Sequence, residues 1–313
     1  MQAIMVSKHG GPEVLEVSEI PMPEPGPGEV LVRVLAAGVG PWDVSLRNGR
    51  LGGDLPYVPG AEFAGVVVGD TGDDAAFDDG EPVYGYPGLT GSYAEYVTCP
   101  SEQLAPIPAG LSGTDAAAVP VDALTARQGL IDELGVGSGD SVLITAAAGG
   151  LGHLAVQIAR ARGANVIATA SRQHHDFVHR LGASVVVDHM EPDWPDQVRR
   201  LAGGIGRVLA CAGPTLAGAA QAASDSAVIA TPVHADSYPG GDRVQWRPYN
   251  GQSRGSDLIA LAPWFDDGSV EVHIARRFYW KDAAAAHRAV EGGHTRGKLV
   301  LVVDEDVAAQ SGL

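Results

Sequence analysis

The sequence predicts an α/β protein in which a small irregular β-barrel precedes a doubly wound, parallel sheet of six strands. Residues 1–120 consist of short apolar stretches broken by glycine and proline, whereas strands and helices alternate after Gly113. A glycine-rich turn at 146–152 lies between a strand and a helix, as is typical of parallel α/β sheets. We therefore expect a first domain at 1–121, a second at 122–252, and a return of 253–313 to the first.

The first domain is predicted from strand-length apolar runs. Prolines in the turn clusters between them, such as residues 21–28, exclude helix and limit strand pairing. The expected strands are Gln2–Ser7, Val14–Ser18, Val30–Ala37, Phe63–Val68, Pro82–Tyr86 and Tyr93–Val97.

The second domain is predicted from alternating strands and helices. Residues 115–134 have a helical period that Pro120 interrupts. The expected parallel strands are Ser141–Thr145, Asn165–Ala170, Ser184–Asp188, Val208–Cys211, Ala227–Thr231 and Arg243–Trp246. The crossover helices are His153–Arg162, Asp176–Leu181, Pro195–Ala202 and Leu216–Ala223.

The last sixty residues favour two helices and one strand. The helices are expected at Ser256–Phe265 and Ala283–Glu291, and the strand at Leu299–Val303. Because a lone apolar strand needs a sheet to join, we expect this one to pair within the first domain.

Composition excludes several classes of function. The formal net charge is −17, so the chain repels nucleic acid and anionic membranes at long range. No apolar stretch has membrane-spanning length and no secretory signal is evident, so we expect a cytoplasmic protein. Cys99 and Cys211 are too few for a disulfide framework. The acidic run Asp70–Glu81 is predicted to be a solvated loop, since it does not match a calcium-binding loop.

The turn Ala146-x-x-Gly149-x-x-Gly152 predicts a phosphate-binding site. Its glycines allow a tight turn and a close approach of the backbone to pyrophosphate, and the helix that follows directs its N–H groups and positive dipole end at the anion. The dinucleotide-binding residues expected here are Ala148, Gly149, Gly150, Leu151 and Gly152. The alternative is a tight strand-to-helix turn without a ligand.

The end of the second parallel strand predicts NADPH rather than NADH. NAD-specific sheets present an acid there to the ribose 2′-hydroxyl, and this chain has Ser171 and Arg172 instead. The guanidinium suits a 2′-phosphate. His175 is the expected third contact, although adjacent His174 remains an alternative, and Arg172 is otherwise an ordinary surface arginine.

The whole chain resembles the medium-chain dehydrogenase/reductase superfamily, specifically its zinc-free quinone oxidoreductase (ζ-crystallin-like) branch. The motifs that carry the resemblance are Met1–Ile4 with Gly10–Leu15, Gly38–Asp43, Pro56–Gly60, Gly91–Val97, Ala146–Gly152, Leu181–Ala183 and Gly293–Lys298. The resemblance implies a GroES-like catalytic domain, a Rossmann domain, and a nicotinamide cofactor and substrate in a cleft between them.

The resemblance also implies that no zinc is bound. Zinc alcohol dehydrogenases have a cysteine where this chain has Gly40 and a histidine where it has Ala61, and neither residue here can ligate metal. Without this Lewis acid, hydride addition to an electrophilic carbon of a quinone or enone remains feasible.

Site residues follow from the resemblance. Thr125 is placed beside nicotinamide and substrate, or is a helix-interior threonine. Gly40, Trp42 and Ser45 line the substrate pocket. Quinone reductases usually have asparagine at position 40 and commonly tyrosine at 45, so this pocket is expected to be wider and less polar. The remaining cofactor contacts are Cys211, Gly213, Thr231 and Lys298, with Lys298 either meeting phosphate or covering the surface.

We therefore expect a cytoplasmic, zinc-independent NADPH reductase of quinones or conjugated alkenes. The proton donor is left open, with Tyr57, Tyr84, Tyr86 and Tyr93 as candidates. A homodimer is expected through the edge strand Arg243–Trp246. The alternatives are a double-bond reductase for one biosynthetic intermediate and a non-enzymatic NADPH-binding protein.

Overall fold

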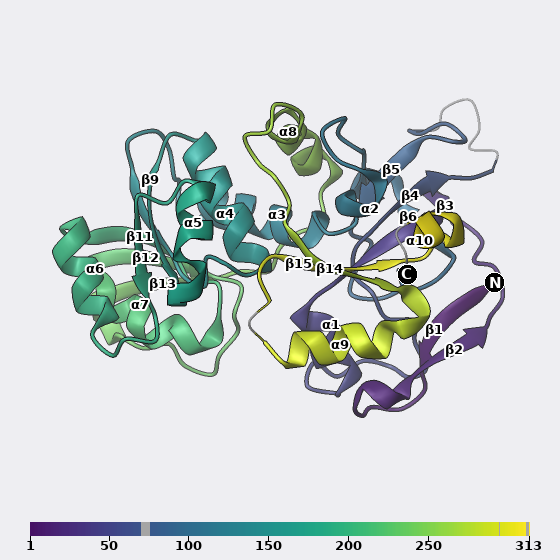
Figure 1. Cartoon of the computed structure of the whole chain (residues 1–313), viewed down its shortest axis with the longest axis horizontal. Helices are drawn as coiled ribbons and strands as arrows, with labels where there is room; N and C mark the ends of the chain where they lie inside the picture. Colours follow the sequence, from purple (N-terminus) through teal and green to yellow (C-terminus); the bar gives the residue numbers. More distant parts are fainter. Residues whose placement is uncertain (70–75, 294, 311–312) are drawn as a thin grey trace. The chain divides into compact units, whose positions relative to one another are not determined.

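The computed structural model describes residues 1–69, 76–293, 295–310 and 313. The chain divides into two compact units, which Figure 1 colours by sequence. Unit 1 consists of residues 1–121, 253–268 and 272–313, and unit 2 of residues 122–252 and 269–271. Each unit has its own sheet and its own apolar core. Asp70, Asp73 and Asp74 of the predicted acidic loop lie outside the described residues.

Unit 1 is built around a seven-stranded sheet. Its strand order is β14-β15-β3-β4-β5-β7, and β6 also pairs with β3. All of these pairings are antiparallel except that of β14 with β15. The strands are β3 (Glu29–Val39), β4 (Phe63–Val67), β5 (Pro82–Gly85), β6 (Tyr96–Pro100), β7 (Leu104–Pro106), β14 (Ile274–Tyr279) and β15 (Lys298–Val302). A separate antiparallel pair consists of β1 (Gln2–Val6) and β2 (Leu15–Glu19).

The core of unit 1 follows from alternation along its strands. In β3, Val30, Val32 and Val34 are buried because they occupy one face of the strand. Their cluster includes Phe63 and Trp280. The helices of this unit are α1 (Pro41–Arg47), α2 (Gly113–Ala116), α8 (Gly255–Asp266), α9 (Ala283–Glu291) and α10 (Glu305–Gln310).

Unit 2 is a parallel sheet of six strands, which confirms the predicted fold class. Its order is β10-β9-β8-β11-β12-β13, so the order reverses at β8, between β9 and β11. The strands are β8 (Ser141–Ile144), β9 (Asn165–Ala170), β10 (Val185–Asp188), β11 (Ile205–Leu209), β12 (Ala223–Thr231) and β13 (Val244–Pro248). All five pairings are parallel.

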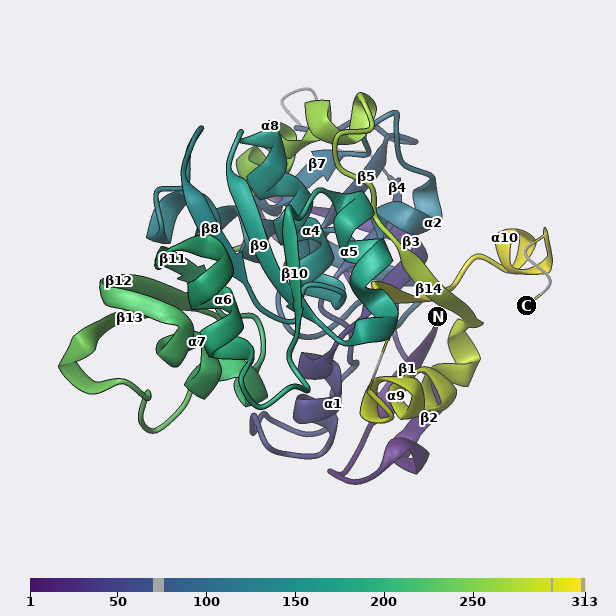
Figure 2. The same ribbon diagram turned by 60° about the vertical axis from the view of Figure 1, so that its left-hand side comes forward.

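The helices of unit 2 pack in pairs. Figure 2 shows α4 (Gly150–Ala161) beside α5 (His175–Leu181), and α6 (Trp194–Ala202) beside α7 (Leu216–Ala222). The helix α3 (Pro120–Arg127) begins at the boundary of the units and continues into a π-helix at Gln128–Glu133. The helix α2 ends at Ala116 and α3 begins at Pro120, so the helical stretch is interrupted before Pro120, and the first helical turn tolerates this proline.

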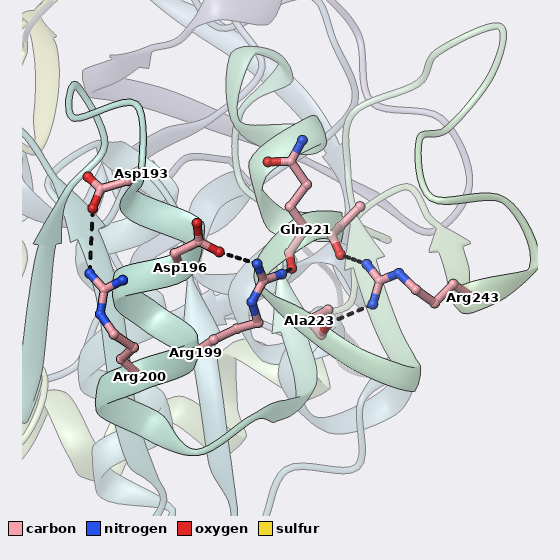
Figure 3. A network of polar contacts seen from close by, with 8 residues as sticks. Asp193, Asp196, Arg199, Arg200, Gln221, Ala223 and Arg243 are labelled. Carbon is pink, nitrogen blue, oxygen red and sulfur yellow. Dashed lines mark hydrogen bonds and ion pairs between the residues drawn. The ribbon is translucent and has the colours of Figure 1, made fainter.

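Two arginines cap the carboxyl end of α7 (Figure 3). Arg199 on α6 donates to the carbonyl of Gln221. Arg243 donates to the carbonyls of Ala220 and, at 2.8 Å, Ala223. Because the last carbonyls of a helix have no partner within it and carry its negative dipole end, the two guanidinium groups stabilise this terminus.

Several elements differ from the sequence predictions. The helix α1 was not among the predicted elements; it begins at Pro41, and proline is well suited to the first helical position. The strand β14 was missed because Arg276 and Arg277 interrupt its apolar run. In the structure Arg277 pairs with Asp115, and the Arg276 guanidinium lies 4.3 Å from the centroid of the Phe278 ring.

Two further differences concern strand positions in unit 1. The strand β6 begins at Tyr96 rather than Tyr93, because the carbonyl of Tyr93 instead accepts from Ile4 of β1. The short strand β7 was not predicted at all.

Within the described residues, no helix has the length and apolar character needed to span a bilayer.

Candidate active site

The glycine turn of unit 2 joins β8 to α4. Ala146 has a φ of 51°, a left-handed conformation that costs an alanine energy and that clusters at functional sites. The N-cap of α4 is Gly149, which has no side chain to accept from the N–H groups of the first helical turn. Those donors and the positive end of a 12-residue helix can therefore serve an anion.

The two glycines of this turn are required for different reasons. A Cβ on Gly152 would lie 2.3 Å from the Ala146 carbonyl oxygen and 2.6 Å from Ala147 Cα, so the close packing of the helix start requires glycine there. A Cβ on Gly149 would meet only the Ala146 oxygen, at 3.4 Å, and its φ of −78° suits any residue. The fold therefore does not require glycine at 149, whereas a closely approaching ligand would.

Three more predicted residues lie at the same edge of the sheet. Cys211 and Gly213 follow β11, and Thr231 ends β12. In the sheet, β11 lies next to β8, and β12 lies next to β11. The Thr145 hydroxyl accepts from the Cys211 backbone N–H at 3.1 Å and is paired with the Thr215 hydroxyl at 2.7 Å. The Thr231 hydroxyl donates to the Ala210 carbonyl at 2.8 Å. Burial raises the pKa of the Cys211 thiol, so the thiol stays protonated and unreactive.

Ser171, Arg172 and His175 lie together just beyond β9. Ser171 is the N-cap of a short turn, Arg172–His174. The Arg172 side chain is 76% exposed and lies 3.3 Å from Glu191 and 3.7 Å from Asp188. His175 Nε2 lies 3.1 Å from the Ala170 carbonyl oxygen, whereas His174 Nε2 lies near the Gln173 amide. The exposed guanidinium is thus flanked by two carboxylates, a feature that the sequence did not reveal.

Thr125 lies on α3 and is packed against the loop after β13. Its carbonyl accepts from the Tyr249 hydroxyl at 2.8 Å. A Cβ on Gly251 would lie 2.4 Å from the Thr125 hydroxyl oxygen, so Gly251 makes room for this side chain. The Gln128 amide bonds to both the N–H and the carbonyl of Gln252. Sequence reasoning found Thr125 but missed this supporting loop.

Gly40, Trp42 and Ser45 come together at the start of α1 in unit 1. Gly40 is the N-cap, and its N–H donates to Asp43 Oδ2 at 2.8 Å. The Trp42 ring lies against Gly40, since a Cβ there would be 2.3 Å from the indole Cζ2. Ser45 is half-buried one turn further along α1. At position 40 itself the indole fills the space that a side chain would take, and the width and polarity of the whole pocket stay a prediction.

Lys298 begins β15 in unit 1 and is only 2% exposed. Its Nζ lies 2.7 Å from Glu62 Oε1, and Glu62 is itself fully buried. The alternative that Lys298 covers the surface is therefore wrong. Its contact with a cofactor phosphate stays a prediction, and that contact would require the exchange of this buried partner, which is costly.

Sequence reasoning missed Asp43 as a site residue. Its carboxyl is fully buried. Burial raises its pKa to about 7, the Gly40 N–H opposes this rise, and the Glu62 carboxylate adds to it. The Pro41 and Asp43 that follow Gly40 are the helix-start signal that could have identified this carboxyl as a cap.

The candidate tyrosines of unit 1 keep their protons. Burial and the Asp43 carboxylate raise the pKa of Tyr57 to about 12. Burial also raises the pKa of Tyr84, Tyr86 and Tyr93. Among the described residues, no group of three or more histidine, cysteine, aspartate or glutamate side chains is arranged to hold a metal ion.

Comparison with known proteins identifies the family. Residues 26–109 match the model of the alcohol dehydrogenase GroES-like domain, and residues 162–301 match a model described as zinc-binding dehydrogenase. A solved structure described as an NAD-dependent alcohol dehydrogenase is 33% identical, with a TM-score of 0.88 over 97% of this chain and all of the other. The chain belongs to the medium-chain dehydrogenase/reductase superfamily.

Other members of the superfamily share this similarity. The quinone oxidoreductase of Coxiella burnetii is 30% identical, with a TM-score of 0.86 over 97% of this chain and 99% of that one. A mycobacterial protein, Rv1454c, solved in complex with NADPH, is 29% identical, with a TM-score of 0.86 over 97% of this chain and all of that one. Human quinone oxidoreductase is 36% identical over 209 residues, which are 65% of this chain and 63% of the human one. The alignments thus span somewhat less than two thirds of such curated relatives.

Proposed function

We propose that this chain is a zinc-independent, NADPH-dependent reductase that transfers hydride to quinones or conjugated carbonyl compounds. The observation that carries the proposal is the glycine at position 149. The fold has room for a side chain there, whereas a pyrophosphate that approaches the backbone closely would require glycine. The similarity to quinone oxidoreductases and to a protein solved with NADPH supports the same reaction class and cofactor.

The residues of unit 2 fit such a cofactor. We assign the pyrophosphate to the turn Ala148–Gly152, the 2′-phosphate to Ser171, Arg172 and His175, and the nicotinamide side to Thr125, Cys211, Gly213 and Thr231. NADPH, when bound, supplies a hydride. The protein then contributes orientation and hydrogen bonds rather than a nucleophile, because the Cys211 thiol is held protonated.

The substrate residues that we propose in unit 1 favour acceptors that are already electrophilic. Gly40 and Ala61 offer no metal ligand, so a Lewis acid has no site at these positions. Hydride addition to a quinone leaves a delocalised, weakly basic anion that solvent protonates. A simple ketone would instead leave a strongly basic alkoxide, which needs an acid or a metal in the transition state.

The test is NADPH oxidation by the purified protein with a panel of quinones, enones, simple ketones and alcohols, with and without a chelator. We expect turnover of a small quinone or enone, retained after chelation, and negligible turnover of simple ketones. NADPH binding without turnover of any acceptor would contradict the proposal and support a binding protein. Turnover of a single complex enone would support a dedicated double-bond reductase. Zinc-dependent alcohol oxidation would contradict the reaction class.

A further inference from the structure

Glycine at position 40 is imposed by a side chain rather than by the backbone. The φ and ψ of Gly40 are −136° and 172°, an extended conformation that any residue adopts. A Cβ at this position, however, would lie 2.3 Å from Cζ2 and 2.4 Å from both Cε2 and Cη2 of Trp42. Near-equal distances to three adjacent ring atoms place that Cβ over the face of the indole. No side chain therefore fits at position 40 while Trp42 holds this position.

The same indole lies close to a buried ion pair. Lys298 Nζ lies 4.9 Å from the centroid of the Trp42 ring and 2.7 Å from Glu62 Oε1. Lys298 is 2% exposed and Glu62 is fully buried. An ammonium taken out of water gains from an aromatic face as well as from its carboxylate. The Trp42 indole thus packs closely against the backbone of Gly40 and is attracted by the Lys298 ammonium, and both contacts favour one fixed position of the ring.

The side chain of Trp42 presents an apolar surface at this place. The residue is half-buried, and its one polar atom, Nε1, is buried and lacks a hydrogen-bond partner within the described residues. The exposed part of the side chain is therefore carbon. A polar group of a substrate placed against it would lose hydrogen bonds to water without gaining any.

We propose that Gly40 and Trp42 form a single specificity element. The indole fills the space that a side chain at position 40 would occupy, and its exposed carbon surface selects acceptors whose ring is apolar along the edge that contacts the indole. This proposal rests on the proposed function, because it concerns the substrate of that reaction. It predicts that an unsubstituted or alkyl-substituted quinone is reduced in preference to one with a hydroxyl or carboxylate group on the same edge.

The two residues must then be coupled energetically, which a double-mutant cycle measures without any substrate. The proteins compared are the wild type, Gly40→Ala, Trp42→Ala and the double variant. We expect Gly40→Ala to lower the midpoint of thermal unfolding by about 3 °C or more, because it displaces the ring. In the Trp42→Ala background the same substitution should have no such effect. Gly26→Ala is the matched control, since a Cβ at Gly26 would meet only Glu29, at 3.4 Å.

Substrate preference gives the second measurement. We expect Trp42→Ala to reduce the ratio of kcat/KM for an alkyl quinone to that for a hydroxylated quinone by about tenfold or more. The Kd for NADPH should stay within about twofold of the wild type. Trp42→Phe, which retains an aromatic ring, should keep most of the preference.

The two failures can be told apart. Additive effects of the substitutions on stability, or an unchanged quinone ratio in Trp42→Ala, would overturn the specificity element. If no quinone is turned over by any of the proteins, the proposed function fails, whereas the coupling measured by unfolding still reports on the contact itself.

Discussion

Asp43 combines a structural and an electrostatic role at one buried carboxyl. Its Oδ2 caps α1, while burial raises its pKa from 3.8 to about 7. Between these two values the folded protein retains a proton that the unfolded chain releases. The stabilisation is therefore complete below about pH 4 and is lost as the pH rises through about 7.

Asp43→Asn tests this linkage, because an amide oxygen can still accept from Gly40 but does not titrate. Relative to the variant, the wild type should lose up to about 1.4 kcal/mol of unfolding free energy per pH unit between about pH 4 and 7. Urea unfolding over this range measures the difference. The exposed Asp193→Asn is the control and should show no such trend with this sign. A difference between wild type and Asp43→Asn that stays constant with pH would contradict the raised pKa.

Arg172 is the residue on which the preference for NADPH depends. Its guanidinium and the partner Glu191 are both exposed, so the exchange of this ion pair for a phosphate costs little, whereas the other partner, Asp188, is buried. A hydrogen bond to a charged group contributes about 1.5–3 kcal/mol, so Arg172→Ala should weaken NADPH binding roughly 10- to 100-fold. NADH binding should barely change. Cofactor titrations measure both, with Arg180→Ala in the same unit as the charge-matched control. An equal loss for the two cofactors would refute the assignment.

The turn between β8 and α4 predicts opposite outcomes for its two glycines. Gly152→Ala should destabilise the protein by about 1–3 kcal/mol, because its Cβ would collide with the backbone of the turn. Gly149→Ala should leave stability almost unchanged and weaken NADPH by about tenfold or more, since only the ligand needs that space. Denaturant unfolding and NADPH titration on both variants test this pair. Wild-type affinity in Gly149→Ala would leave the turn without a ligand role.

Elements with a strong period could be predicted from the sequence, whereas contacts between distant residues could not. The parallel strands and the α4 turn carry local signals in apolar runs and glycine spacing. The strand β14 carries none, because Arg276 and Arg277 acquire their partners, Phe278 and Asp115, only in the folded chain. The pair Lys298–Glu62 likewise joins residues that lie 236 positions apart, so no local sequence spacing encodes their proximity.

At the scale of the whole molecule, β13 lies at an edge of the parallel sheet and is predicted to be the dimer interface. Its Trp246 is fixed by a hydrogen bond to Pro239 and by stacking on Tyr238. Light scattering at micromolar concentration should give twice the chain mass of 32.2 kDa. Gln245→Lys, which adds a charge to each exposed edge, should shift the mass toward one chain, whereas Gln310→Lys on α10 should not. A monomeric wild type would rule the dimer out.

The place of β15 in its sheet determines the order in which the two units can complete their sheets during translation. Synthesis runs from the amino to the carboxyl end, and all the strands of the parallel sheet lie between residues 141 and 248. β3 is made early, yet residues 36–39 pair with β15 only once residues 299–302 have been translated. Until then Glu62 lacks its ammonium partner, and part of β3 is an open edge. The sheet whose first strands are translated early therefore completes its pairing last. Until β15 is made, the open edge of β3 must not pair with strands from elsewhere.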